Sequence, residues 1–305
     1  MRAVFLGTPA AAVPALAALV QIADVAVVIT QPDAPRGRSR RLVSPPIKVA
    51  AVEWGIEVSQ ATDDAQLLST LRREEIDVGV VVAYGRILSR PTLDTTRFGF
   101  VNVHFSLLPR WRGAAPVERA ILAGDDLTGV SLMVLEEGLD TGPVIAVTES
   151  PIDDDETGGM LTARLSCLGA DLLSAALPEY LAGKRQPAAQ IGAGASHARR
   201  LTTGDAVIDP MAGAQAIVRK VRAFNPRPGA WLRAGDTRLK VLQASANDEV
   251  VQQGSIVLLA GEAVLGVPDG SVVLNQVQAE GRTSMSGGSW LRGLRVDEIA
   301  VESVG

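Results

Sequence analysis

Hydrophobic and polar positions alternate in blocks along the first 184 residues, and the blocks predict strands and helices in turn. Short, mostly apolar runs rich in valine predict strands buried on both faces, at residues 2–7, 24–31, 77–85, 98–104 and 128–138. Stretches with helical periodicity lie between or after them, at residues 14–23, 67–75, 116–124 and 158–184. Strands that alternate with helices predict an α/β domain built on a parallel, doubly wound sheet.

The pattern changes after residue 184. Residues 185–210 are rich in Gly, Ala, Ser and Pro, a composition that is typical of a linker. One helix is predicted at 212–224, and short strand candidates separated by turns follow it, at 237–245, 254–260, 263–267 and 271–278. This spacing predicts a small antiparallel barrel or sandwich. We therefore expect one domain over 1–186, a linker over 187–206 and a second domain over 207–305.

The composition of the chain bounds the class of protein. A chain of 305 residues is long enough for two domains, and 47% hydrophobic with 21% charged residues is ordinary for a soluble globular protein. No apolar run approaches the roughly 18 residues of a membrane span, and residues 7–9 interrupt the apolar N-terminus before it can imitate a signal peptide. The single cysteine, Cys167, fits a reducing compartment. We expect a cytoplasmic protein that acts as a monomer, without a membrane partner.

Charge and side-chain chemistry limit the kinds of ligand that the chain is expected to bind. Because the net charge is −5, contact with a nucleic acid must come from local basic patches. Two histidines, His104 and His197, and one cysteine are too few for a conventional zinc site, so we expect no metal.

Two polar residues end the strand predicted at 98–104. Ligands of open parallel sheets bind outside the carboxyl ends of the strands, and "GFVNVH" carries Asn102 and His104 to such an end. Since side chains alternate along a strand, both residues point to the same side. The pair offers an amide donor next to an acid/base group. An isolated pair of this kind is equally explained by a turn-capping asparagine and a hydrogen-bonded core histidine.

A third polar residue, Asp140, lies between two glycines in "EEGLDTGPV" (136–144), after the next predicted strand. Glycines on both sides permit a tight loop, in which an aspartate can also serve only as a turn residue. Together the three residues describe a site for acyl transfer to an amine. Asn102 can donate to a developing oxyanion, His104 can carry a proton, and Asp140 can orient His104. No serine or cysteine nucleophile beside a histidine is evident, which favours direct attack by the substrate.

These segments resemble a known family. "NVHFSLLPRWRGAAP" followed by "LDTG" is similar to the signature of the 10-formyltetrahydrofolate-dependent formyltransferases. Further matching motifs lie along nearly the whole chain: "GTP" (7–9), "TQPDAPRGRSRRLVSPPIKV" (30–49), "VVVAYG" (80–85), "IDP" (208–210) and "RAFNPRPGAW" (222–231). This longer set is similar to the branch of the family that formylates methionine esterified to initiator tRNA.

The resemblance implies a fold, a reaction and a site. The fold is a Rossmann-like, mostly parallel α/β domain that binds folate and catalyses, followed by a small OB-like β-barrel that binds tRNA. The reaction transfers a formyl group from 10-formyltetrahydrofolate, a donor co-substrate, to the α-amino group of initiator methionyl-tRNA. Asn102, His104 and Asp140 match the catalytic trio of the family. The tetrahydrofolate-binding loop is matched by Ser106, Leu107, Leu108 and Pro109, whose apolar members suit a flat pterin.

A basic segment, "APRGRSRRL" (34–42), matches the insertion loop with which this branch contacts the acceptor stem of tRNA. The matching residues are Arg36, Arg38, Arg40 and Arg41, and Arg38 aligns with the key arginine of that loop. Arginine suits phosphate because its donors are bidentate, although a bare arginine cluster is equally compatible with a solvated loop. A second basic stretch at 218–240 gives the C-terminal domain a candidate RNA-facing side.

Three alternatives stay open. Relatives with the same trio act on an amino-sugar nucleotide or on water, but the arginine loop and the basic C-terminal stretch favour tRNA. A nucleotide-binding or dehydrogenase module is disfavoured because "FLGTPAAAVP" lacks G-x-G-x-x-G, and no acidic ribose-binding residue follows the second strand in the expected place. A purely RNA-binding role leaves the trio without a purpose.

Overall fold

The computed structural model describes residues 1–36 and 41–302, and the chain divides into two compact units. Unit 1 comprises Met1–Pro116, Leu127–Pro151 and Thr162–Arg199, whereas unit 2 comprises Val117–Asp126, Ile152–Leu161 and the chain from Arg200 onward. Two short segments from within residues 1–186 therefore belong to the second unit. The domains predicted over 1–186 and 207–305, with a linker between them, stay a prediction.

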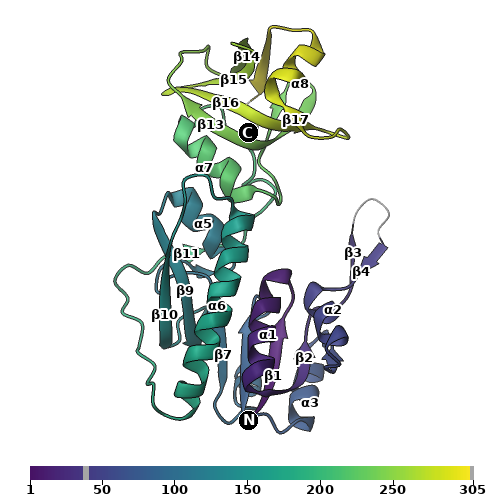
Figure 1. Ribbon diagram of the computed structural model, residues 1–305, viewed down its shortest axis with the longest axis vertical. Helices are drawn as coiled ribbons and strands as arrows, with labels where there is room; N and C mark the ends of the chain where they lie inside the picture. Colours follow the sequence, from purple (N-terminus) through teal and green to yellow (C-terminus); the bar gives the residue numbers. More distant parts are fainter. Residues whose placement is uncertain (37–40, 303–305) are drawn as a thin grey trace. The chain divides into compact units, whose positions relative to one another are not determined.

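A seven-stranded sheet forms the centre of unit 1 (Figure 1). The five strands from β7 to β5 run parallel, and β9 and β10 add an antiparallel edge. This arrangement confirms the mostly parallel α/β sheet. In spatial order the strands are β10 (Val144–Pro151), β9 (Leu127–Val134), β7 (Phe100–His104), β6 (Val78–Val82), β1 (Arg2–Gly7), β2 (Asp24–Ile29) and β5 (Val58–Ser59).

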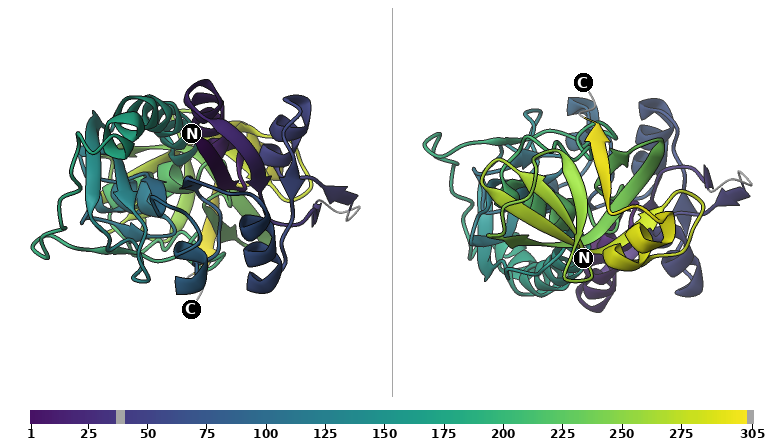
Figure 2. Two further views of the ribbon diagram at one scale, coloured as in Figure 1. Left: turned by 90° about the horizontal axis from the view of Figure 1, so that it is seen from below. Right: turned by 90° about the horizontal axis from the view of Figure 1, so that it is seen from above.

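Helices cover both faces of this sheet, which explains why its central strands are apolar without alternation. Figure 2 shows α1 (Val13–Ile22) and α6 (Gly158–Leu181) on one face and α3 (Asp64–Arg73) and α4 (Arg90–Leu93) on the other. All five residues of β6 are buried. The shorter elements of unit 1 are η1 (Ala10–Ala12), β3 (Ala34–Arg36), β4 (Arg41–Val43), α2 (Pro46–Glu53), β8 (Arg112–Gly113) and β11 (His197–Ala198).

A close approach between α6 and β7 orients the polar end of β7. A Cβ atom added at Gly169 of α6 would lie 2.6 Å from Cγ1 of Val103 in β7, so a larger residue there would push the helix away. Neighbouring residues of a strand point to opposite faces. Because Val103 faces α6, Asn102 and His104 face the other side of the sheet.

Helix α6 is long and apolar enough to cross a membrane by length and composition alone. Core helices of soluble proteins can be equally long and apolar, and 44% of the most apolar 18-residue stretch of α6 is buried in the structure. Four leucines at four-residue or eight-residue spacing are fully buried along one stripe: Leu161, Leu165, Leu173 and Leu177. A buried stripe of this kind is typical of a helix that packs on a core. The absence of a membrane partner stays a prediction.

A closed barrel of six antiparallel strands forms the centre of unit 2, which confirms the predicted small β-barrel. The ring is closed by pairing between β13 and β16. In order around the ring the strands are β13 (Thr237–Asn247), β12 (Trp231–Ala234), β18 (Glu298–Glu302), β14 (Ser255–Leu259), β15 (Glu262–Val267) and β16 (Gly270–Ala279). The other elements are β17 (Met285–Ser286), α7 (Ala214–Phe224), α8 (Gly287–Leu294) and α5 (Pro116–Ala123), whose first residue belongs to unit 1.

Candidate active site

The carboxyl end of β7 carries Asn102 and His104 side by side on one face. Asn102 pairs with Val81 of β6 and with Met133 of β9, so it lies in the interior of the sheet. Its side chain is half-buried, whereas His104 is only 5% exposed. Both side chains face Asp140: Asn102 Nδ2 lies 3.5 Å from Asp140 Oδ1, and His104 Nδ1 lies 3.8 Å from Asp140 Oδ2. Three polar residues from two segments thus meet at one point.

A hydrogen bond to backbone fixes the role of each nitrogen of His104. Nε2 lies 2.9 Å from the carbonyl oxygen of Trp111. A carbonyl oxygen only accepts, so Nε2 must carry a hydrogen and donate it. The nitrogen that gains or loses a proton is therefore Nδ1, which faces the carboxylate of Asp140.

The loop that joins β9 to β10 holds Asp140 in a left-handed conformation with φ +50°. Aspartate tolerates this region better than most residues. Its Oδ2 accepts a hydrogen bond of 2.8 Å from the backbone N–H of Gly113, and the residue is 9% exposed. A backbone donor aimed at a carboxylate is a charge-assisted bond, which fixes the direction of the side chain.

The segment that follows β7 is held rigidly by hydroxyl groups. Ser131 Oγ donates to the carbonyl of Ser106 at 2.8 Å and accepts from the N–H of Leu108 at 3.1 Å. Ser106 Oγ donates to the carbonyl of Arg110 at 2.6 Å and is itself fully buried. Leu107, Leu108 and Pro109 are only partly buried. The binding of folate by residues 106–109 stays a prediction.

The trio brings together an amide donor, a proton carrier and a carboxylate, which are the groups that acyl transfer to an amine uses. The chain matches the formyl transferase family over residues 1–177 and the formyl transferase C-terminal domain over residues 200–295. A Halorhodospira halophila protein named methionyl-tRNA formyltransferase is 46% identical over 301 residues, which cover 97% of each chain. The chain belongs to the methionyl-tRNA formyltransferase family. Its relative of the same name from Paenarthrobacter aurescens is 43% identical and covers 99% of each chain.

Solved structures share the fold of this formyltransferase at low identity. An N-formyltransferase from Helicobacter canadensis, in complex with folinic acid and dTDP-3-aminofucose, superposes with a TM-score of 0.68 at 17% identity, covering 89% of this chain and 97% of that one. HypX from Aquifex aeolicus in complex with tetrahydrofolic acid has a TM-score of 0.66 at 16% identity, covering 95% of this chain and 47% of that one. These likenesses concern the fold alone.

The candidate site also contains residues for which the sequence pattern predicts no role. Trp111 and Gly113 belong to the signature motif, but no periodicity indicates that their backbone groups hold His104 and Asp140. Gln190 lies in the segment predicted as a linker, yet its side chain binds the backbone of the Asp140 loop. Only the fold brings residues 50 positions apart into contact.

Replacing Gly142 with alanine is expected to lower kcat of this formyltransferase by about 10-fold or more, since displacements of about 1 Å at a site cost up to about 100-fold. A Cβ atom at Gly142 would lie 2.0 Å from the carbonyl oxygen of Val134, so the loop with Asp140 must move. Steady-state kinetics and thermal melting measure the effect. Gly293→Ala on α8 is the matched control, because a Cβ atom there also meets nothing within 4 Å. Equal kcat for the two variants would contradict this reading of the loop.

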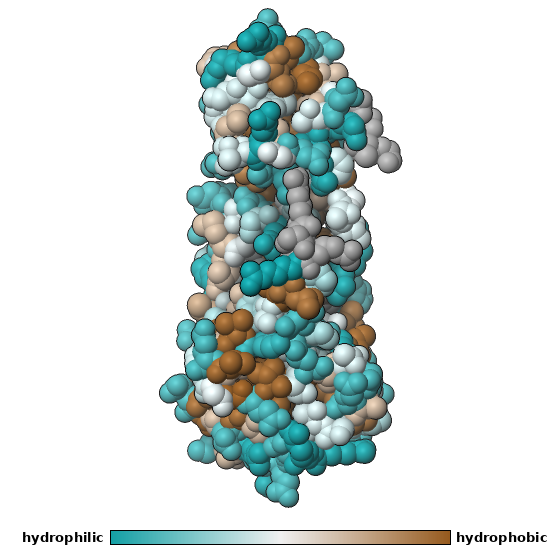
Figure 3. Space-filling view, turned by 90° about the vertical axis from the view of Figure 1, so that its right-hand side faces the viewer, coloured by the Kyte–Doolittle hydropathy of each residue, from teal (hydrophilic) through white to brown (hydrophobic). Residues whose placement is uncertain are grey.

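The arginine segment forms a short antiparallel hairpin, β3 with β4. Arg38 and Arg40 lie outside the described residues, and only the backbone of Arg36 is described. Arg41 is exposed at the start of β4. Leu42 and Val43 beside it are also exposed, and Figure 3 shows apolar side chains gathered on this side of unit 1. The contact of these arginines with tRNA stays a prediction.

A polar network closes the base of this hairpin. Asp33, just before β3, accepts hydrogen bonds from Ser44 just after β4 at 3.0 Å, from Lys48 at 2.9 Å and from Gln60 at 2.8 Å. The hydrogen bonds from Lys48 and then Gln60 lower the pKa of Asp33 below its usual value. The carboxylate therefore stays charged at neutral pH and ties both ends of the hairpin to α2.

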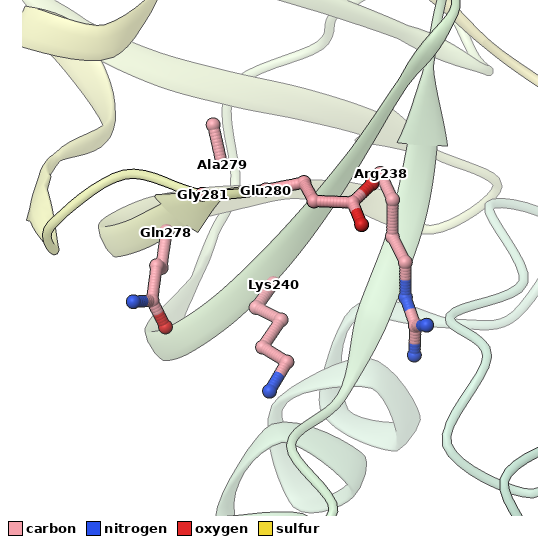
Figure 4. Close-up of a pocket in the computed structure, with 6 residues that line it drawn as sticks. All are labelled: Arg238, Lys240, Gln278, Ala279, Glu280 and Gly281. Carbon is pink, nitrogen blue, oxygen red and sulfur yellow. The ribbon is translucent and has the colours of Figure 1, made fainter. Parts of the chain in front are cut away.

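The basic stretch at 218–240 separates into two groups with different roles. On α7, Lys220 donates to the carbonyl of Val207, Arg222 donates to the carbonyls of Asp153 and Glu156, and burial lowers the pKa of both cations. On β13, Arg238 and Lys240 project from the same side of the strand into a groove (Figure 4). The other residues that line this groove are Gln278, Ala279, Glu280 and Gly281.

An aromatic ring lies in the same surface of the barrel. Trp231 of β12 pairs with Lys240 across the ladder, and the guanidinium of Arg238 lies 4.0 Å from the centre of its ring. Cations beside an aromatic face on an open surface are the elements that bind a nucleic-acid strand. Within the described residues, no group of three or more His, Cys, Asp or Glu is placed to hold a metal ion.

Proposed function

We propose that this protein transfers the formyl group of 10-formyltetrahydrofolate to the α-amino group of methionine carried by initiator tRNA. The observation that carries the proposal is the meeting of Asn102, His104 and Asp140 at the carboxyl end of β7. Relatives that match almost the full chain at 43–46% identity are named methionyl-tRNA formyltransferase, which supports the choice of acceptor.

Asn102 is the oxyanion donor in this proposal. When the amine attacks the formyl carbon, negative charge develops on the formyl oxygen. The Nδ2 group of Asn102 carries two hydrogens, and its contact with Asp140 at 3.5 Å engages only one of them. The other hydrogen can be donated to the formyl oxygen. Because β6 and β9 hold the strand on both sides, the donor is already oriented before the charge appears.

His104 and Asp140 handle the proton. The attacking α-amino group must be neutral, and a free α-amino group has a pKa of roughly 7.7–8.0, so little energy is required to deprotonate it. As the new amide forms, the bond between the formyl carbon and N10 of the donor breaks, so a proton leaves the amine and N10 must receive one. Nδ1 of His104 is the free ring nitrogen, and the carboxylate of Asp140 at 3.8 Å stabilises the imidazolium that results. The remaining task is to position the two substrates.

The apolar wall made by Leu107, Leu108 and Pro109 suits the pterin ring of the donor, and the backbone of the same loop can bind its polar edge. Ser106 supports the loop from inside. The donor supplies the formyl group, and we take 10-formyltetrahydrofolate as that donor. Both substrates are cytoplasmic, so the proposal places the protein in the cytoplasm, acting as a monomer.

Reversing the charge of the barrel groove, as Arg238→Glu with Lys240→Glu, is expected to raise the tRNA KM by about 10-fold. Each phosphate contact contributes a salt-dependent term, so the slope of log affinity against log salt should fall by roughly 1–2. The KM for folate and kcat at saturating tRNA should stay unchanged. Initial rates with tRNA and folate varied separately, at two salt concentrations, measure these quantities.

A matched control for this variant exists after α6. Lys184 and Arg185 are exposed, and Lys184→Glu with Arg185→Glu makes the same change in net charge. This control should keep the tRNA KM and the salt slope of the wild type. The same tRNA KM in both double variants would contradict a tRNA contact at the groove.

Acceptor specificity tests the proposed function. We expect the purified protein to formylate initiator methionyl-tRNA with a much higher kcat/KM than elongator methionyl-tRNA, and not to formylate free methionine. An amino-sugar nucleotide, the ligand of the Helicobacter canadensis structure, is the competing acceptor. A higher kcat/KM with the amino-sugar nucleotide would overturn the proposal.

A further inference from the structure

A segment predicted as a linker runs across the candidate active site. We refer to residues 188–198 as the strap. At its start, Ala188 and Val144 exchange two backbone hydrogen bonds of 2.8 Å. At its end, His197–Ala198 pairs with Arg112–Gly113, and the carbonyl of Ala198 accepts from the N–H of Ala114 at 2.8 Å. The backbone of the strap is therefore fixed to unit 1 on both sides of the site.

The side chain of Gln190, within the strap, makes four hydrogen bonds. Its Nε2 group donates to the carbonyls of Asp140 at 2.9 Å and Gly142 at 2.7 Å. Its Oε1 atom accepts from Arg112, from Nε at 2.9 Å and from Nη2 at 2.7 Å. Two donated and two accepted bonds are the full capacity of a carboxamide. Glutamate lacks the donors and lysine lacks the acceptor, so the position requires an amide.

These bonds join the two segments that hold the catalytic pair. Arg112 lies between Trp111, whose carbonyl accepts from His104, and Gly113, whose N–H binds the carboxylate of Asp140. The other partners of Gln190 are carbonyls of the Asp140 loop itself. Gln190 therefore bridges the neighbours of His104 to the backbone of Asp140, where φ is +50°.

We propose that Gln190 is a positioning residue for formyl transfer, which sets the placement of the Asp140 carboxylate against His104 without touching substrate. The kinetic test of this inference depends on the proposed function, because it measures formyl transfer. Donation to the carbonyl of Asp140 stabilises the loop in its left-handed conformation. Without it, the loop relaxes, and the 3.8 Å contact between the carboxylate and Nδ1 is lost.

Gln190→Glu removes the two donors and keeps the size and the acceptor for Arg112. We expect kcat to fall by about 10–100-fold with both KM values within about 2-fold, because misplacement near the chemistry costs rate and not binding. Gln186→Glu is the matched control, since Gln186 is exposed in the same region and donates only to the carbonyl of Gly183. The control should keep the kcat of the wild type. Gln190→Ser tests the same loss without a new charge if the first variant fails to fold.

A double-mutant cycle with Asp140→Asn separates positioning from a general structural effect. In the Asp140→Asn protein, Gln190→Glu should cost less than about 2-fold in single-turnover rate, because the carboxylate that it positions is already gone. Full additivity, an effect confined to KM, or an unchanged kcat in Gln190→Glu would each overturn the inference.

Hydrogen exchange provides a test that needs no substrate. In Gln190→Glu, exchange at the N–H of Gly113 should accelerate, because the carboxylate that accepts it is released, while exchange in β6 should not change. Unchanged exchange at Gly113 would overturn the inference. If the wild type formylates a different amine, the proposed acceptor is wrong but the role of Gln190 can still be tested. The double-mutant cycle with Asp140→Asn is then measured with that amine.

Discussion

Asn102→Ala is expected to lower kcat for formyl transfer by about 10²–10³-fold, the usual cost of losing one oxyanion donor. The side chain is half-buried and its hydrogen bond to Asp140 is long, at 3.5 Å, so its removal should cost little stability and the protein should stay folded. The KM for folate and for tRNA should change little, because the lost bond forms in the transition state. Steady-state kinetics with thermal melting measure both parts.

Asn275→Ala removes the same atoms elsewhere and serves as the control. Asn275 lies on β16 of the barrel and accepts a hydrogen bond of 3.2 Å from Ser245. Its kcat should equal that of the wild type. An unchanged kcat in Asn102→Ala would show that Asn102 is not the oxyanion donor.

His104→Ala and Asp140→Asn are each expected to lower kcat by about 10²–10⁴-fold, the range for loss of a positioned acid or base. The double variant should be no worse than the more severe single variant by more than about 3-fold, because residues that act as one unit do not contribute independently. The structural reason is that Nδ1 of His104 and Oδ2 of Asp140 face each other across 3.8 Å. Single-turnover rates with excess enzyme complete this cycle.

The two substitutions differ in their effect on stability, which must be measured beside the rates. Asparagine keeps the shape of Asp140 and tolerates φ +50°. Alanine at position 104 removes the hydrogen bond from the buried imidazole to the carbonyl of Trp111, at a cost of about 0.5–1.5 kcal/mol. If the two rate losses multiply in a double variant that is still folded, the residues act separately and the shared proton site is wrong.

The α/β core could be predicted because its buried strands have mostly apolar sequences. The strands β1, β6 and β7 are covered on both faces, so nearly every residue is apolar and the runs are visible. The edge strand β10 escaped prediction because only part of it is buried and it contains Thr148 and Glu149, which read as a loop. Helix α2 escaped because its start is a pair of prolines, Pro45 and Pro46, at positions that also suit a turn.

Candidate site residues on one strand were accessible to pattern reasoning, and those joined by tertiary contacts were not. The spacing of Asn102 and His104 indicates a shared face, since the period of a strand is two. Asp140 is 38 residues away from Asn102, and it was linked to the pair only by its place between two glycines after the next predicted strand and by the resemblance to the family. Gln190 lies in a glycine- and alanine-rich stretch whose composition is typical of a linker, so nothing local reveals its four hydrogen bonds.

Identification of the labelled product tests the transfer of the formyl group to initiator methionyl-tRNA. The purified protein is incubated with 10-formyltetrahydrofolate labelled in the formyl carbon and with initiator methionyl-tRNA, and the amino acid is released from the tRNA and identified. With the wild type, we expect label in N-formylmethionine, and with Asn102→Ala the label should appear about 10²–10³-fold more slowly. Label found only in free formate, or N-formylmethionine formed equally fast by both proteins, would contradict this expectation.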